Sequence, residues 1–197
     1  PRSRPAPASP PPPLDGLPEP PVLPWSAANH IDLVAGYTLE GIPVYYPFDG
    51  APKFPSPTLK MQRCATYTIS LTNSLDEKTN LHTHGLHVSG EMPGDDVIDV
   101  EVEVGQTHTY TYYIPCTHST GTLFYHPHGH GTTAGQISAG LAGALIVDDE
   151  ANKEAVPEWL TKMRSFVFLA QKLGSSYRVN GVDAAQASLA MQRNEWV

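Results

Sequence analysis

The chain has 197 residues, a formal net charge of −8 and 40% hydrophobic residues. This length suits one well-buried domain with additional segments. The acidic balance argues against a nucleic-acid partner, which would need a basic patch. The sequence also has no run of 18 apolar residues, so we expect no membrane span.

Proline dominates the beginning of the chain. Eleven of the 20 prolines fall within residues 1–24, including four in a row at 10–13. Such a composition cannot bury apolar surface, so residues 1–24 are expected to form a disordered or polyproline-like arm. This arm would be a linker, a processed N-terminus or a partner-binding segment. Because the sequence starts at Pro1 without a signal peptide, we expect a mature or partial product.

Residues 25–160 carry the pattern of an all-β domain. Short apolar or alternating runs are separated by Gly, Pro, Asn and Asp, which is typical of a β-sandwich with Greek-key connections. Prolines within Gly41–Phe48 keep that run off a central strand. A short helix is expected at Thr132–Ala139. The expected strands are Asn29–Leu39 (an edge strand), Cys64–Leu71, Leu81–Ser89, Ile98–Val104, Thr107–Ile114, Thr122–His126 and Leu141–Val147.

The rest of the chain has weaker signals. Ala151–Leu160 is expected to be a helix or turn, and Met163–Leu173 a strand that leaves the first domain. The chain has two cysteines, Cys64 and Cys116. We expect a disulfide between them, with free buried thiols as the alternative. A disulfide would place the protein in an oxidising compartment.

Two His-x-His pairs lie at or beside expected strands. They are His82 with His84, and His126 with His128. Residues i and i+2 of a strand point to the same face, so each pair would present two imidazoles on one side of the backbone. If the two strands meet, four imidazoles converge, and imidazole suits copper, zinc, iron and nickel.

These motifs resemble the first domain of multicopper oxidases, the group of laccases, bilirubin oxidases and bacterial copper oxidases. The resemblance rests on His82-Thr-His-Gly-Leu86, on Phe124-Tyr-His-Pro-His-Gly-His-Gly131, and on Gln136 followed by Gly140-Leu-Ala-Gly143. It runs from about Leu59 to Val147 and implies a cupredoxin-like sandwich over residues 25–160. Residues 161–197 would be a linker and the start of a second, truncated cupredoxin domain, since Tyr177–Gly181 resembles its opening.

The resemblance also implies a role for each ligand. His82 would bind the type 2 copper, and His84, His126 and His128 the paired type 3 coppers. This trinuclear cluster reduces dioxygen to water with electrons from a small organic or metal-ion reductant. The family completes the cluster with histidines of another cupredoxin domain and adds a type 1 copper, for which this chain has no His-Cys-His segment. The given chain is therefore expected to supply half of the trinuclear site and to be inactive alone.

Other polar residues near the pairs receive open assignments. Asp95 or Asp96 is a candidate proton relay near the type 2 copper, or a solvated turn carboxylate. Gln136 would orient a histidine ligand or cap the short helix. His130 is expected to support the site without binding metal, and His87 to face away. His108 and His118 are expected at the surface, and His30 is expected to be a surface or capping residue.

Two other function classes remain open. One is a structural or interaction role for a cupredoxin sandwich, and the other is copper binding or storage without turnover. An oxidase of this group would act outside the cytoplasm, as a secreted, periplasmic or cell-surface protein. Its remaining cupredoxin domains would come from the same or another chain.

Overall fold

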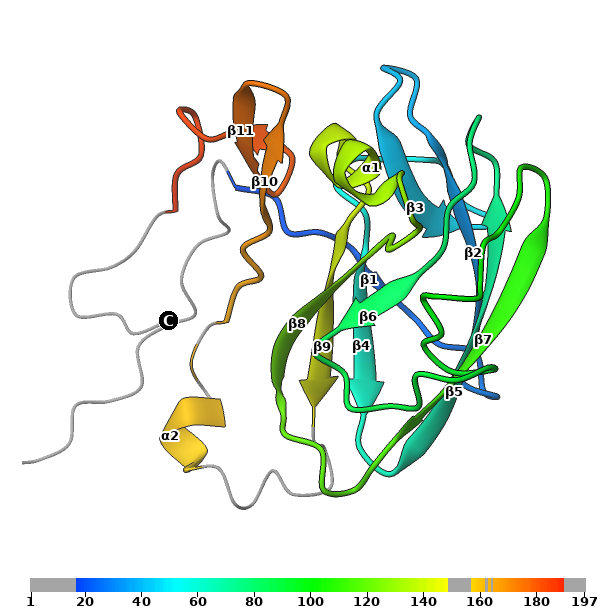
Figure 1. The fold of residues 1–197 in the computed structure, drawn as a ribbon. Coiled ribbons are helices and arrows are strands. Elements are labelled where there is room, and N and C mark those ends of the chain that lie inside the picture. Colours follow the sequence, from blue (N-terminus) through cyan, green and yellow to red (C-terminus); the bar gives the residue numbers. More distant parts are fainter. Residues whose placement is uncertain (1–16, 149–156, 162, 164, 190–197) are drawn as a thin grey trace, which may run out of the picture.

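A computed structural model describes residues 17–148, 157–161, 163 and 165–189. Two sheets lie face to face and form the expected all-β sandwich (Figure 1). In each sheet, strands distant in sequence are neighbours, as a Greek-key connection requires. The first sheet has the order β1 (Val22–Leu23), β4 (Thr58–Gln62), β9 (Gly143–Asp148), β8 (Gly121–His126) and β6 (His82–His84). The second has the order β3 (Pro43–Pro47), β2 (His30–Tyr37), β5 (Ala65–Asn73) and β7 (Thr107–Ile114).

Period-two alternation explains how the second sheet faces the core. In β5, Tyr67, Ile69 and Leu71 are buried, whereas the residues between them are partly exposed. The antiparallel partner β7 buries Tyr110, Tyr112 and Ile114 in the same way. Both alternations were predicted from the sequence. As also predicted, β9 is an apolar central strand and β3 lies at a sheet edge.

Three buried tyrosines tie the two sheets to the loops. Tyr45 donates from its hydroxyl to the carbonyl of Asn80 at 3.0 Å, and Tyr125 donates to the carbonyl of Pro57 at 2.7 Å. Tyr110 accepts the amide N–H of Leu81 at 3.0 Å. Burial raises the pKa of each of these phenols, so they remain neutral hydrogen-bonding groups. Two of these bonds end beside the first histidine pair.

The predicted disulfide is present. Cys64, in the turn between β4 and β5, bonds to Cys116 in the loop after β7, with the two Cα atoms 4.3 Å apart. The bond closes a loop with a sequence separation of 52, and this loop contains the first histidine pair but not the second. The cross-link therefore joins the two sheets at one end of the sandwich.

The strand predicted at Ile98–Val104 is wrong. Only one bridge forms there, between Val102 and Thr79, and the segment is otherwise irregular. Val100 and Val102 are buried, whereas Ile98 is 85% exposed. The alternation therefore indicated burial correctly at Val100 and Val102 but not at Ile98 and Val104, and the segment covers the core as a loop because it has no continuous pairing partner.

The beginning and the first long strand also differ from expectation. Within the expected arm, Val22–Leu23 forms β1 and pairs in parallel with β4. Leu17 and Leu23 of this segment are buried. Residues 1–16 lie outside the described residues. The strand β2 was expected at an edge, yet it lies between β3 and β5 because it pairs with both.

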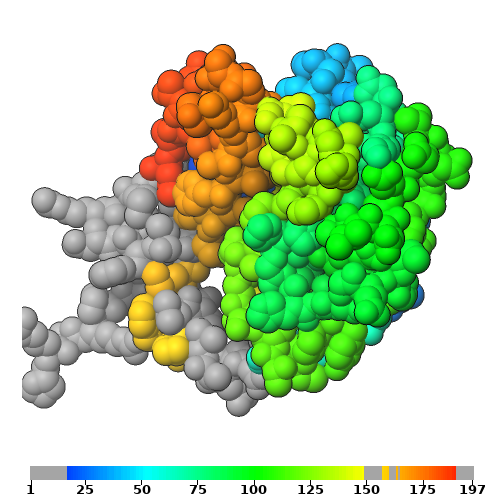
Figure 2. Space-filling view, viewed as in Figure 1, coloured from blue at the N-terminus to red at the C-terminus, as the bar shows by residue number. Residues whose placement is uncertain are grey.

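The C-terminal part forms a small separate sheet beside the sandwich. Figure 2 shows this region against α1 (Thr133–Ala139), the predicted short helix. Gln171 donates to the carbonyl of Gly140 at 3.0 Å, and the amide of Gly174 donates to Ser138 at 3.3 Å. Among the described residues of the strand predicted at 163–173, the last four are regular. The elements are α2 (Glu158–Thr161), β10 (Ala170–Leu173), β11 (Ser176–Val179) and β12 (Val182–Asp183).

Within the expected helix or turn at 151–160, α2 begins at Glu158, and residues 149–156 lie outside the described residues. Across the described part of the chain, neither helix has the length and apolar character needed to cross a membrane.

Candidate metal centre

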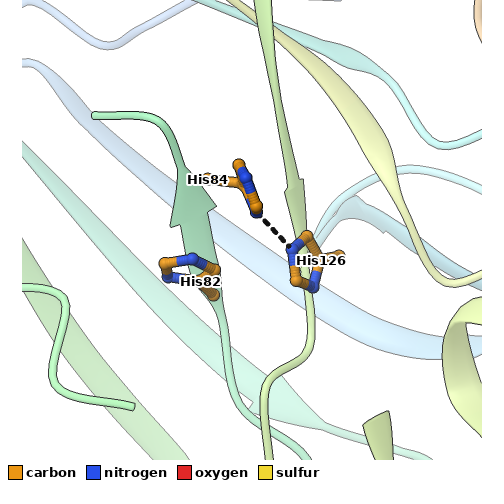
Figure 3. A group of neighbouring side chains, drawn as sticks. All are labelled: His82, His84 and His126. Atoms are coloured by element: carbon orange, nitrogen blue, oxygen red, sulfur yellow. Dashed lines mark hydrogen bonds between the residues drawn. The ribbon is translucent and has the colours of Figure 1, made fainter. Parts of the chain in front are cut away.

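Strands β6 and β8 bring the two histidine pairs together. They are antiparallel, with His82 opposite His126 and His84 opposite Phe124. His82, His84 and His126 each offer a ring nitrogen, and these three atoms lie within 4.8 Å of one another (Figure 3). Between the first two, Thr83 is fully buried, so both imidazoles point to the opposite, accessible face. The strand register thus produces the predicted convergence.

A glycine ends β6 directly after the first pair. Gly85 has φ +90°, and an added Cβ would lie 2.8 Å from Cδ2 of Leu123. A larger residue here would strain the backbone and push against the neighbouring strand. Gly85 therefore fixes where the strand stops and how closely β8 approaches His84.

Hydrogen bonds at Nδ1 leave the Nε2 atoms of two imidazoles available. The Nδ1–H of His126 donates to the carbonyl of Pro127 at 2.8 Å, and Nδ1 of His82 lies 2.7 Å from Oδ2 of Asp95. Since each ring then carries its proton on Nδ1, each Nε2 is unprotonated. The Nε2 of His126 lies 3.3 Å from Nδ1 of His84, in a hydrogen bond that a metal ion would replace. These are the nitrogens that a metal ion would use.

The environment keeps His126 neutral. Burial is the main cause that lowers its pKa, and the neighbouring imidazoles lower it further, against the opposing bond to Pro127. Only an unprotonated imidazole can bind a metal ion. His126 is therefore prepared for ligation at neutral pH.

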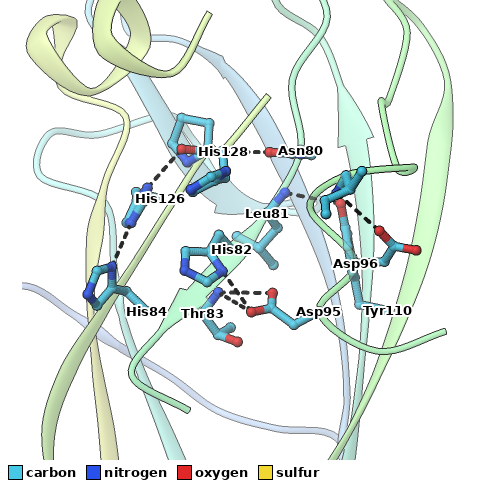
Figure 4. Close-up of polar contacts among 12 residues, drawn as sticks. Asn80, Leu81, His82, Thr83, His84, Asp95, Asp96, Tyr110, His126 and His128 are labelled. Carbon is cyan, nitrogen blue, oxygen red and sulfur yellow. Dashed lines mark hydrogen bonds and ion pairs between the residues drawn. The ribbon is translucent and has the colours of Figure 1, made fainter. Parts of the chain in front are cut away.

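The fourth histidine of the prediction is held differently. His128 lies beyond the end of β8 and is exposed, with its ring centroid 5.1 Å from that of His82 and 6.2 Å from that of His126 (Figure 4). Its backbone N–H donates to Oδ1 of Asn80 at 2.6 Å. The structure thus brings all four predicted ligands to one end of the β6–β8 pair, although only three form the tight group.

The two aspartates have distinct environments. Asp95 is buried and accepts from His82 and from the backbone N–H of Thr83 at 3.1 Å. Asp96 is also buried, but its Oδ1 accepts the amides of Ile98 and Asp99, at 3.1 and 2.9 Å, and holds the loop. Of the two, Asp95 hydrogen-bonds to the histidine cluster and Asp96 to the loop that follows it.

The sequence motifs did not assign a role at the site to Phe124. Its ring stacks on His84 with centroids 4.4 Å apart and an interplanar angle of 19°, and on His126 at 5.0 Å. The sequence contains a signal for this contact. Phe124 stands two positions before His126 on the same strand, and a residue at this position can face a histidine of the neighbouring strand.

Several neighbouring polar residues have other roles than expected. Gln136 neither orients a ligand nor caps α1, because its amide bonds to Glu77, Lys78 and Thr79. His118 was expected at the surface but is 4% exposed, and its Nε2 accepts the backbone N–H of His87 at 3.0 Å. His130 is exposed.

The donor set suits copper. Two imidazoles of the group, those of His82 and His126, direct Nδ1 to a carboxylate or a carbonyl, which is the usual support of a metal-binding histidine. Imidazole donors favour late first-row metals, with Cu(II) strongest among the divalent ions. The residues present therefore fit a copper site.

Comparisons with known proteins assign the family. The multicopper oxidase family profile matches residues 50–152, more than half of the chain, and this range includes every residue of the candidate centre. The chain belongs to the multicopper oxidase family. The multicopper oxidase mco of Staphylococcus haemolyticus is 37% identical over 93 residues, 47% of this chain and 20% of that protein. The iron transport multicopper oxidase FET3 of Candida albicans is 33% identical over 100 residues, 49% of this chain and 15% of that protein.

Solved structures share the fold of this multicopper oxidase chain. The McoA multicopper oxidase of Aquifex aeolicus superposes with a TM-score of 0.68 at 21% identity, over 86% of this chain and 42% of that one. The chain thus spans less than half the length of the relatives that it matches. The cupredoxin sandwich expected from the resemblance is confirmed.

Proposed function

We propose that this chain supplies the first-domain half of a trinuclear copper site in an oxidase that reduces dioxygen to water. His82 would hold the type 2 copper, and His84, His126 and His128 the type 3 pair. The observation that carries the proposal is the meeting of three imidazole nitrogens within 4.8 Å across β6 and β8 in a multicopper oxidase domain. The remaining ligands would come from another cupredoxin domain of the same or another chain.

When bound, copper would supply the one-electron redox chemistry and the reduction of dioxygen. The protein would prepare the ligands. Asp95 holds the Nδ1 proton of His82 and directs its Nε2 toward the shared centre, and Pro127 does the same for His126. Asp95 is also the better candidate for a proton relay, because its Oδ2 contacts His82, whereas the hydrogen bonds of Asp96 go to loop amides.

The reductant would be a small organic molecule or a metal ion. The name of the Candida albicans relative refers to iron transport, which supports a metal ion as one candidate class. We further propose that residues 25–160 are the cupredoxin domain, and that residues 161–197 are a linker and the start of a second one. The small sheet of β10, β11 and β12, outside the two sheets of the sandwich, supports this division.

The site would work outside the cytoplasm. The Cys64–Cys116 disulfide supports this location, because such bonds persist in oxidising compartments. The chain alone would bind copper without turnover until the second set of ligands is supplied.

Copper content and oxygen uptake test the proposal. The chain is refolded with copper, and bound metal is counted for wild type and for a His82→Ala/His128→Ala double variant. We expect the double variant to keep its circular dichroism spectrum and to lose copper. Unchanged copper stoichiometry would refute the ligand assignment, and a copper-free wild type would favour a structural role. Oxygen uptake by the intact protein, with a phenol and with Cu(I), distinguishes an oxidase from a storage module.

A further inference from the structure

Strand pairing accounts for three of the four histidines but not for the last. His82 and His84 lie on β6, and His126 lies on β8 opposite them. His128 follows Pro127, outside any strand, and its side chain is exposed. Some other contact must therefore fix the position of His128 relative to the cluster.

Asn80 provides that contact. Its side-chain Oδ1 accepts the backbone N–H of His128 at 2.6 Å, and its Nδ2 donates to the carbonyl of Val100 at 3.0 Å (Figure 4). Its own carbonyl accepts the hydroxyl of Tyr45 at 3.0 Å. Asn80 is fully buried, so these bonds are shielded from water, and breaking one leaves a buried group without a partner.

The position of Asn80 in the chain explains why its bond to His128 influences the histidine cluster. It stands two residues before His82, whose imidazole belongs to the tight group. A single side chain thus joins the segment that enters β6 to the turn that follows β8. Any shift of the turn away from this amide would move His128 away from the other three imidazoles.

We infer that Asn80 is a positioning residue that sets the place of His128 in the copper site. This inference rests on the proposed copper function. Asn80 contacts no metal ligand atom and acts through the backbone of His128. Loss of a supporting partner of this kind typically lowers metal affinity by about 10-fold to 100-fold.

Asn73 offers a matched control. It is also fully buried and also donates from Nδ2 to a carbonyl of the same loop, that of Val102 at 2.8 Å, but its other bonds go to Glu77 and Leu75. An Asn73→Ala variant loses similar buried hydrogen bonds, with no contact to the histidines. It separates a general loss of stability from a specific effect on the site.

The test titrates the chain with Cu(II) and measures amide hydrogen exchange of His128 without metal. Asn80→Ala should weaken Cu(II) binding about 10-fold and expose the His128 amide to exchange, whereas Asn73→Ala should change neither. In a His128→Ala background, Asn80→Ala should have no further effect on affinity, because the ligand that it positions is gone. An equal loss in both backgrounds, or unchanged affinity and exchange in the single variant, would overturn the inference.

A second variant covers the case in which Asn80→Ala does not fold. Asn80→Asp keeps the oxygen that accepts the His128 N–H and loses only the donor to Val100. It should retain protection of the His128 amide, and loss of that protection in a folded Asn80→Asp chain would contradict the inference. If wild type binds no Cu(II), the proposed function fails, and the exchange experiment still tests the contact.

Discussion

The two histidine pairs share one motif but are held by different means. His82 and His84 lie on one strand, and Thr83 between them is buried, so alternation alone aims both imidazoles at the site. In the second pair only His126 lies on a strand, and Pro127 leads the chain out of β8 before His128. The first pair therefore depends on strand register, and the second depends in part on Asn80. The sequence motif thus indicated which histidines lie close together, but it did not indicate which contacts hold them there.

Removal of either pair should have the largest effect. We expect His82→Ala/His84→Ala and His126→Ala/His128→Ala each to abolish stoichiometric copper binding, because each removes at least one member of the tight group. Bound copper after gel filtration measures this. The matched control is His30→Ala/His108→Ala, which removes two histidines outside the cluster. Copper retained after loss of one pair would mean that the other pair suffices.

Loss of the disulfide should lower the free energy of unfolding. It should not affect the two histidine pairs equally. The Cys64–Cys116 bond closes a loop with a sequence separation of 52 that contains only the first pair. On the chain-entropy model its removal costs roughly 4 kcal/mol of unfolding free energy. Urea unfolding of a Cys64→Ala/Cys116→Ala variant measures this loss. An unchanged midpoint would show that the cross-link contributes nothing.

Neutralising Asp95 should weaken the first pair selectively. Asp95→Asn keeps the size of the side chain but removes the charge beside Nδ1 of His82. We expect about a tenfold loss of copper affinity, as for other partners that support a metal-binding histidine. Asp96→Asn is the control, because that buried carboxylate accepts only loop amides. Equal losses in both variants would argue that loop disruption, not the contact with His82, is responsible.

Replacement of Phe124 should have a smaller effect on copper affinity, because its ring contacts one histidine of each pair. It stacks on His84 and on His126, and such contacts contribute about 1 kcal/mol. Phe124→Leu keeps apolar volume and should lower copper affinity about fivefold, as isothermal titration can measure. Tyr113→Leu, an exposed aromatic on β7, serves as control and should leave affinity unchanged. A Phe124→Leu chain with wild-type affinity would remove this residue from the account.

The sequence predicted the sandwich because alternation and turn residues report directly on which side chains are buried. The strand prediction at Ile98–Val104 failed because alternation reports burial and not strand pairing. Val100 and Val102 are buried without a continuous paired strand. The sequence also missed the burial of His118, which depends on a contact with the backbone of His87 in another loop. The contacts of Asn80 with His128 and of Phe124 with His84 likewise join residues far apart in the chain, so local patterns do not reveal them.

The central claim is that imidazoles from β6 and β8 bind one shared metal centre. Pulsed electron paramagnetic resonance of the Cu(II)-loaded chain tests this most directly, because it counts imidazoles bound to each copper. The account predicts that His82→Ala and His126→Ala each lower the number of imidazoles counted in the Cu(II)-loaded chain. A signal that responds to only one of these two substitutions would contradict it.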